Sequence, residues 1–135
     1  MIAATQLRVV LVTPETTLLD EPVKSLQFPL FDGQMGILPG RTPMVGRLGI
    51  GDLILQTEQG ERKYFVDGGF AQIKGSVVTL LTHRAIPADK ISIEAAEKAL
   101  AAANALRPRT DEEFDAKAKE IERARKQLGL RHRMH

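Results

Sequence analysis

Short apolar and alternating runs, separated by Gly and Pro, fill the first two thirds of the chain. They lie at 7–12, 23–28, 36–38, 52–56, 62–66, 70–73 and 76–81, and turn-forming residues such as Asp67-Gly68-Gly69 stand between them. Runs of this length predict strands. Because no helical period separates them, they predict an antiparallel β-sandwich over residues 1–86 rather than a parallel α/β sheet.

The pattern changes to a helical period after Pro87. Ser92 is suited to cap a helix over 92–106, in which apolar residues recur at intervals of three and four. Arg107-Pro108-Arg109 ends this helix, because proline disfavours helical geometry in the residue before it. The apolar positions are Ile93, Ala96, Leu100, Ala103 and Leu106.

A second helix is predicted to start at Thr110, where Thr110 and Glu113 form a capping box. Gly129 is expected just beyond its end. The apolar stripe is narrow and consists of Phe114, Ala118, Ile121 and Leu128. Two helices joined by a short proline turn predict an antiparallel αα-hairpin over 87–135, so the fold class is α+β. The pattern leaves open whether this hairpin moves or packs permanently on the sandwich.

The basic charge of the chain is concentrated at its end. Residues 1–86 carry eight Lys/Arg and eight Asp/Glu, whereas the last thirteen residues hold five bases and no acid. A basic tail is explained by a solvated helix end that complements the macrodipole. A docking role for Arg123, Arg125, Lys126, Arg131 and Arg133 therefore needs a separate argument.

Residue patterns that would indicate an enzyme are missing. The chain has no cysteine, the glycines at 33–36 lack the Lys-Ser/Thr of a phosphate-binding loop, and no serine lies in a nucleophile elbow. The three histidines form no i, i+4 metal-binding pair. We expect no catalytic residue, metal or cofactor. An apolar N-terminal stretch is interrupted by Arg8 and ends at Thr13-Pro14, so we expect a soluble protein without a membrane-spanning segment.

Two glycine-rich segments carry a resemblance to a known family. They are Gly33-Gln34-Met35-Gly36-Ile37-Leu38-Pro39-Gly40-Arg41-Thr42-Pro43-Met44 and Val66-Asp67-Gly68-Gly69-Phe70-Ala71-Gln72-Ile73. In order, spacing and total length, the chain from about Leu7 to Leu128 resembles the epsilon subunits of F-type ATP synthases. The resemblance implies a non-catalytic central-stalk subunit that binds the gamma subunit and the membrane c-ring, at the cytoplasmic face of the bacterial inner membrane.

The resemblance also implies roles for particular residues. It places Gln34 and Arg41 at ring-facing positions, although the family's loop histidine is Arg41 here and an acid found in some members is Gln34. It implies that the C-terminal hairpin docks on the alpha and beta subunits through its basic residues and restrains ATP hydrolysis. Some members bind ATP through an acid and an arginine near the start of the first helix; here these are Ser92 and Ala95, so no nucleotide site is expected.

Two other functions compete with this one. One is a stand-alone β-sandwich interaction module with a helical arm, which would not copurify with a multisubunit ATPase. The other is a nucleic-acid binder that uses the basic tail. The neutral sandwich and the few aromatic residues, one Tyr and five Phe, argue against nucleic acid.

Overall fold

The computed structural model describes residues 7–31, 33–37 and 44–133 of the chain. Within them the chain forms a β-domain and a helical hairpin, which separate into two compact units, Met1–Ala85 and Ile86–His135. The strands are β1 (Leu7–Val12), β2 (Thr17–Val23), β3 (Ser25–Leu30), β4 (Gly33–Ile37), β5 (Met44–Thr57), β6 (Gly60–Lys74), β7 (Val77–Leu81) and β8 (Ala85–Pro87). A 3₁₀ turn, η2 (Ala88–Lys90), precedes α1 (Ile93–Ala105) and α2 (Asp111–His132).

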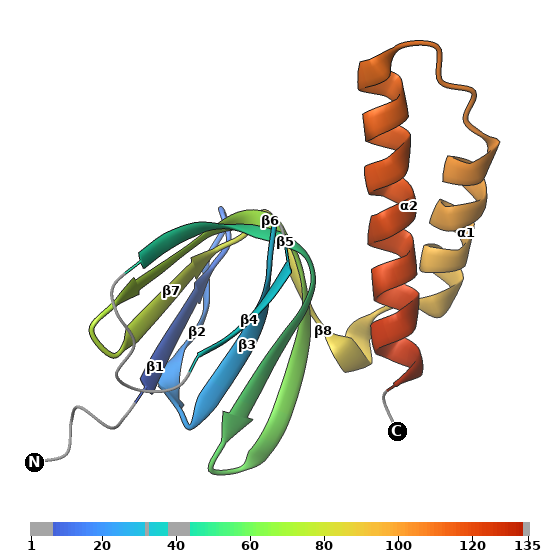
Figure 1. Cartoon of the computed structure of the whole chain (residues 1–135). Coiled ribbons are helices and arrows are strands. Elements are labelled where there is room, and N and C mark those ends of the chain that lie inside the picture. The colour runs from blue at the N-terminus through green and yellow to red at the C-terminus, as the bar shows by residue number, and fades with distance from the viewer. Residues whose placement is uncertain (1–6, 32, 38–43, 134–135) are drawn as a thin grey trace, which may run out of the picture. The chain divides into compact units, whose positions relative to one another are not determined.

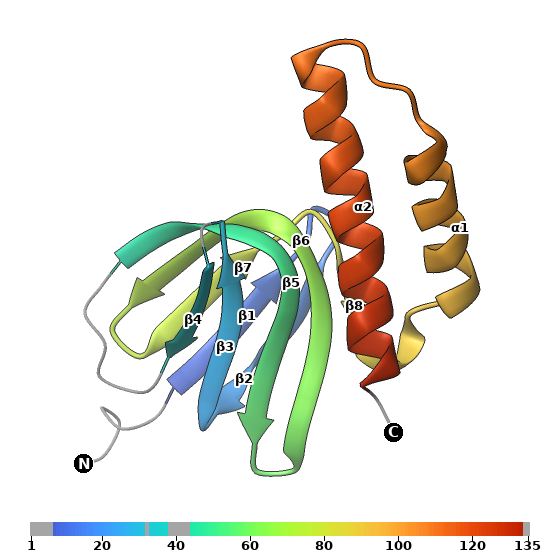
Figure 2. The same ribbon diagram turned by 45° about the vertical axis from the view of Figure 1, so that its right-hand side comes forward.

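The strands are hydrogen-bonded in the order β2-β1-β7-β6-β5-β3-β4, with β8 paired to β6. The long hairpin of β5 and β6 curves so that its two halves serve both layers of a sandwich (Figures 1 and 2). The sandwich and the following helices confirm the predicted fold class. Adjacent strands along this order run antiparallel except β1 and β7, which are parallel.

Alternating side chains form one core between the layers. In β1 the residues Leu7, Val9 and Leu11 are buried, and in β7 Val78 and Leu80 are buried. The second layer contributes residues of β3 and β5, among them Leu26, Phe28, Leu53 and Leu55. Because successive strand residues point to opposite faces, the residues between these positions lie on the outer side of each layer.

The Asp67-Gly68-Gly69 segment lies within β6, so the two strands predicted on either side of it form one continuous strand. Gly68 and Gly69 have φ angles of 72° and 116°, which glycine adopts readily and other residues rarely do. The backbone N–H of Asp67 donates to Arg84 O at 3.1 Å and to Thr82 Oγ1 at 3.2 Å. These bonds hold the curved part of β6 against residues 82–84.

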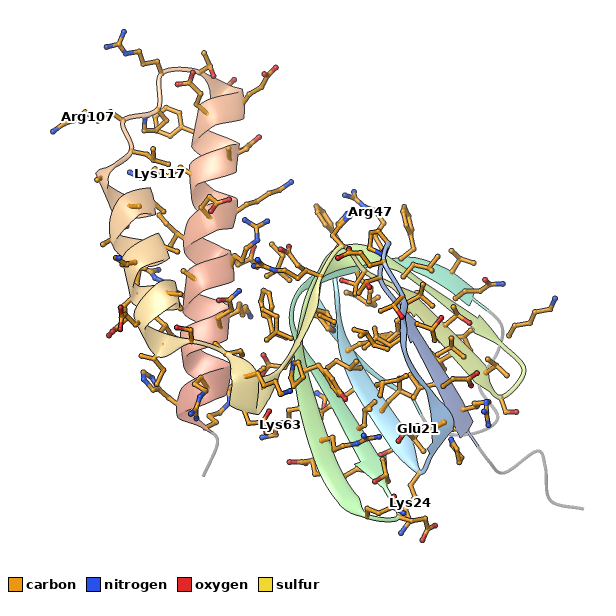
Figure 3. All side chains as sticks on the ribbon, turned by 180° about the vertical axis from the view of Figure 1, so that it is seen from behind. Glu21, Lys24, Arg47, Lys63, Arg107 and Lys117 are labelled. Carbon is orange, nitrogen blue, oxygen red and sulfur yellow. The ribbon has the colours of Figure 1, made fainter. Side chains whose placement is uncertain are left out.

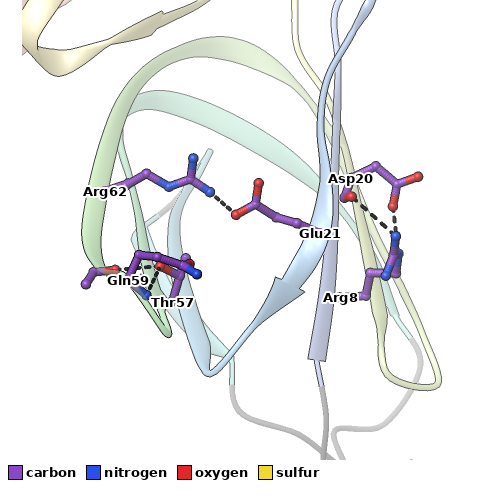
Figure 4. Close-up of polar contacts among 7 residues, drawn as sticks. Arg8, Asp20, Glu21, Thr57, Gln59 and Arg62 are labelled. Atoms are coloured by element: carbon purple, nitrogen blue, oxygen red, sulfur yellow. Dashed lines mark hydrogen bonds and ion pairs between the residues drawn. The ribbon is translucent and has the colours of Figure 1, made fainter.

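An ion pair joins the two layers at the rim of the sandwich (Figure 4). Arg62 in β6 donates to the Glu21 carboxylate in β2. Glu21 lies between the buried residues Leu19 and Val23, so it projects from the inner face of its strand. The side chains of Glu21 and Arg62 remain 32% and 41% exposed. The pair therefore closes a hydrated rim rather than filling the core.

The two helices begin at the predicted caps. Ser92 Oγ accepts from Ala95 N at 3.1 Å, and Thr110 Oγ1 accepts from Glu113 N at 3.1 Å. A capping box would also have the Glu113 carboxylate accept from the Thr110 backbone N–H. Instead, Glu113 Oε1 accepts from the N–H of the preceding residue, Arg109, at 2.8 Å. The Glu113 carboxylate thus holds the connection before α2, while the Thr110 hydroxyl holds the first turn.

The far end and the apolar stripe of α2 differ from the sequence prediction. The helix does not end before Gly129 but continues to His132. Leu130, the residue after this glycine, is completely buried, and its burial favours continued helix over a glycine cap. Phe114 and Ala118 are exposed, whereas Ala124 is buried with Leu130. In α1 the buried positions are Ala96 and Ala103, two of the five predicted stripe positions, whereas Leu106 is exposed.

Candidate docking surfaces

Large side chains form a row on the outer face of the β5-β6-β7 layer. Arg47 lies directly across from Phe70, and Phe70 lies directly across from Leu81. Their chain neighbours Leu48, Ala71 and Leu80 are buried in the core. Residues opposite each other in antiparallel strands share a face, so Arg47, Phe70 and Leu81 all point away from the core.

Phe31, just after β3, extends this row. The Arg47 guanidinium carbon lies 4.2 Å from the centroid of the Phe31 ring, close enough for a cation–π contact. The backbone N–H of Phe31 also donates to Arg47 O at 3.0 Å. Figure 3 shows Arg47 on the outer side of the curved crest of the sandwich. Backbone and side chain together fix Phe31 beside Arg47.

We refer to Phe31, Val45, Arg47, Phe70 and Leu81 as the outer-face patch. The exposed fraction is 61% for Phe31, 71% for Val45, 53% for Phe70 and 48% for Leu81. Apolar residues clustered on one face, with an arginine among aromatic rings, are typical of protein interfaces. The composition of this surface therefore resembles that of a protein interface.

Sequence reasoning did not find the outer-face patch. A signal for it exists: the runs LRVVLV and SVVTLL place apolar residues on both faces of their strands, as do Phe70 and Ala71 in β6. A strand with one face exposed to solvent normally alternates between apolar and polar residues. Apolar residues on the second face are thus a signal in the sequence, but which of them cluster depends on the strand order.

Only one of the two predicted ring-contact residues, Gln34, lies in the part of the chain that the structure describes. Gln34 lies in β4, where its backbone is in register with Pro29 of β3. Arg41 lies outside the described residues. Their joint role stays a prediction.

The basic residues of α2 are not equivalent. Arg123 donates to the Glu120 carboxylate at 2.7 Å, one turn earlier in the helix. Arg125 and Lys126 are exposed, Arg131 is partly buried, and Arg133 is exposed at the C-cap. The exposed ones among the five bases are therefore Arg125, Lys126 and Arg133.

The start of α1 uses its polar group for the helix itself. Ser92 is the N-cap, and its hydroxyl already accepts the Ala95 amide. Ala95 is exposed and offers no polar side-chain atom. This geometry accounts for Ser92 by helix capping, as the sequence predicted.

Two further features concern metal binding and membrane spanning. Among the described residues, no group of three or more His, Cys, Asp or Glu side chains is arranged to hold a metal ion. In the same part of the chain, neither helix combines the length and apolar character needed to cross a bilayer.

Comparison with known proteins identifies the family. Residues 6–88 match the beta-sandwich domain of the ATP synthase delta/epsilon chain. The chain is 48% identical over 122 residues to an ATP synthase epsilon chain from Rhodopirellula baltica, covering 90% of this chain and 95% of that protein. It is 33% identical to the epsilon chain of Desulforamulus reducens, covering 91% and 88% of the two chains.

Solved structures agree with this assignment. A chain of the Euglena gracilis mitochondrial ATP synthase, in an OSCP/F1/c-ring structure, superposes with a TM-score of 0.80 at 28% identity, covering 90% of this chain and 78% of that one. A chain of the Tetrahymena thermophila central stalk/c-ring structure has a TM-score of 0.74 at 13% identity and supports the fold alone. The family match spans all strands of the sandwich, and the two relatives cover about nine tenths of the chain, helices included. The chain belongs to the epsilon chains of ATP synthase, which are non-catalytic subunits of that complex.

Proposed function

We propose that this chain is a rotor subunit of the central stalk, which couples the gamma subunit to the membrane ring and restrains ATP hydrolysis through its helical hairpin. The proposal rests on one observation above all: the sandwich exposes a row of large side chains that a globular domain working alone has no need to expose. The relatives supply the assembly in which such a surface would be covered.

The outer-face patch is our candidate for the gamma-subunit contact. The apolar area comes from Phe31, Phe70 and Leu81. Arg47, over the Phe31 ring, supplies hydrogen-bond donors. Covering such a patch removes the exposed apolar surface from water and desolvates the cation–π pair, which strengthens it. A rigid sheet also loses little conformational entropy when it binds, because its strands are already ordered.

The ring contact is proposed for Gln34 and Arg41. Both belong to the segment that resembles the family's glycine- and proline-rich loop. The support is the register of β3 and β4, which ties the first part of this segment to the sandwich. An amide and a guanidinium would offer hydrogen bonds to polar groups of the ring.

The hairpin is proposed to dock on acidic surfaces of the alpha and beta subunits. Arg125 and Lys126 are exposed, and no acid follows them in the chain. Their attraction to acidic partners would be long-ranged and weakened by salt. Arg123, Arg131 and Arg133 add charge at the same end of α2.

We also propose a location for the chain. We place the chain at the cytoplasmic face of the bacterial inner membrane, held there only through its partners. The support is the high identity to a chain from the bacterium Rhodopirellula baltica.

Copurification tests the function against its main alternative, a stand-alone interaction module with a helical arm. The tagged full-length chain is expressed in its native cells, and detergent-solubilised membranes are passed over the affinity resin. We expect the alpha, beta and gamma subunits and ring to be retained in fixed ratio. Retention of the chain alone, from membranes that contain assembled ATPase, would contradict the proposal and favour the alternative.

A further inference from the structure

The C-terminal end of α1 lacks the features that normally complete a helix. Its C-cap residue is Leu106, in extended rather than left-handed geometry, and its last turn contains no basic residue. The last carbonyl groups of a helix have no partner within the helix, and the macrodipole leaves partial negative charge there. This end of α1 therefore requires donors from elsewhere.

A lysine of the other helix supplies them. Lys117 Nζ in α2 donates to Leu106 O at 3.0 Å and to Asn104 O at 3.4 Å. Figure 3 shows Lys117 near the end of the hairpin at which the two helices are connected. The Lys117 ammonium thus donates to the last carbonyl groups of α1, as a lysine or a glycine cap at a helix C-terminus does in other proteins. Here the donor comes from the neighbouring helix.

A second α2 side chain holds the same connection one turn earlier. Glu113 Oε1 accepts from Arg109 N, and Glu113 stands four residues before Lys117. Residues at this spacing lie on one face of a helix. The connection between Leu106 and Arg109 is therefore tied to a single face of α2 by one acid and one base.

We propose that Lys117 is an interhelical cap that keeps the hairpin closed at its turn. Its contacts exist only while α1 and α2 lie side by side, so separating the helices would leave the α1 carbonyls with water alone and loosen the last turn of α1. Closure of the hairpin and order at the end of α1 are coupled through this one side chain. The inference concerns the chain by itself and does not depend on the proposed partners.

Amide exchange on the isolated full-length chain tests the first half of this coupling. Leu106 N donates to Ala103 O at 3.2 Å, so the exchange rate of the Leu106 amide reports directly on the last turn. Replacing Lys117 by Met (K117M) keeps an unbranched stem and removes the donors. We expect the Leu106 amide to exchange about two- to fivefold faster, with little change at the start of α1.

The matched controls separate capping from a general loss of charge. Lys119 is exposed on the same helix and shares no hydrogen bond or ion pair in the described part of the chain, so K119M should leave the exchange rate unchanged. K117R retains a cationic donor and should restore protection. Equal acceleration in K117M and K119M, or no acceleration in K117M, would overturn the proposal.

A distance measurement tests the second half. The chain has no cysteine, so spin labels can be attached uniquely through Ala99→Cys and Glu122→Cys, two exposed positions on α1 and α2. We expect K117M, but not K119M, to shift the distribution of label distances toward longer values. An unchanged distribution in K117M would contradict the claim that this lysine keeps the hairpin closed.

Discussion

Gly69 lies against the backbone of Leu81, and the space between them admits no side chain. A Cβ atom on Gly69 would overlap the carbonyl oxygen of Leu81 and lie 2.8 Å from its carbonyl carbon. The same residue has a φ angle of 116°. Gly69 is therefore required both for backbone conformation and for the close approach of β6 and β7 at the edge of the outer-face patch.

This relationship predicts a large effect for Gly69→Ala and offers a matched control. Gly60 has nearly the same φ, 115°, but a Cβ atom there would meet nothing within 4 Å. We expect Gly60→Ala to lower the free energy of unfolding by about 1–3 kcal/mol, the cost of the backbone conformation alone. Gly69→Ala should cost more than about 4 kcal/mol because backbone atoms must also move. Equal losses in urea denaturation would show that the overlap does not matter.

The sandwich should fold without the hairpin. Its main core cluster is formed entirely by residues between Leu7 and Leu80, and the division into two units falls between Ala85 and Ile86. We expect a fragment of residues 1–86 to show one cooperative thermal transition by calorimetry. A fragment that aggregates or melts without a heat-absorption peak, while the complete chain melts cooperatively, would contradict the independence of the two units.

The hairpin prediction concerns ATP hydrolysis. Removing residues 110–135 should raise the hydrolysis rate of the reconstituted complex, because the docking charges and the α2 helix are both lost. Arg125→Glu should act in the same direction, by at most about fivefold at low salt, since a single exposed ion pair contributes no more than about 1 kcal/mol.

Arg107→Glu is the control for that charge reversal. Arg107 is an exposed arginine in the connection between the helices, far along the hairpin from Arg125. Arg107→Glu should change the rate of ATP hydrolysis less than Arg125→Glu does. Added salt should reduce the difference in rate between the two variants. If truncation leaves hydrolysis unchanged at low salt, the basic end of α2 serves only to complement the helix dipole.

Local chemistry explains which elements the sequence predicted well. Ser92 and Thr110 cap their helices because a short side chain reaches the amide three residues ahead, whatever the rest of the fold does. β1 was predicted at its observed bounds, Leu7–Val12, because its apolar residues, broken only by Arg8, end at the Thr13-Pro14 turn. Such signals are contained in a few adjacent residues.

Long-range packing explains the elements that were missed. β2 contains Asp20, Glu21 and Pro22, which are uncommon in strands, yet it is an edge strand where a proline is tolerated. The burial of Leu130 carries α2 past Gly129. The outer-face patch combines residues from three strands and the end of a fourth, so no local pattern could assemble it.

The central claim is that the outer-face patch docks the central stalk, and binding of the purified gamma subunit tests it most directly. Phe70→Glu places a charge in the patch, while Phe114→Glu places the same charge on an equally exposed phenylalanine of α2; the wild-type side chains are 53% and 57% exposed. The account predicts that Phe70→Glu weakens binding at least tenfold, about 1.4 kcal/mol or more, with an unchanged thermal midpoint of the sandwich, and that Phe114→Glu binds gamma like the parent chain. Parent-like affinity of Phe70→Glu for gamma would contradict it.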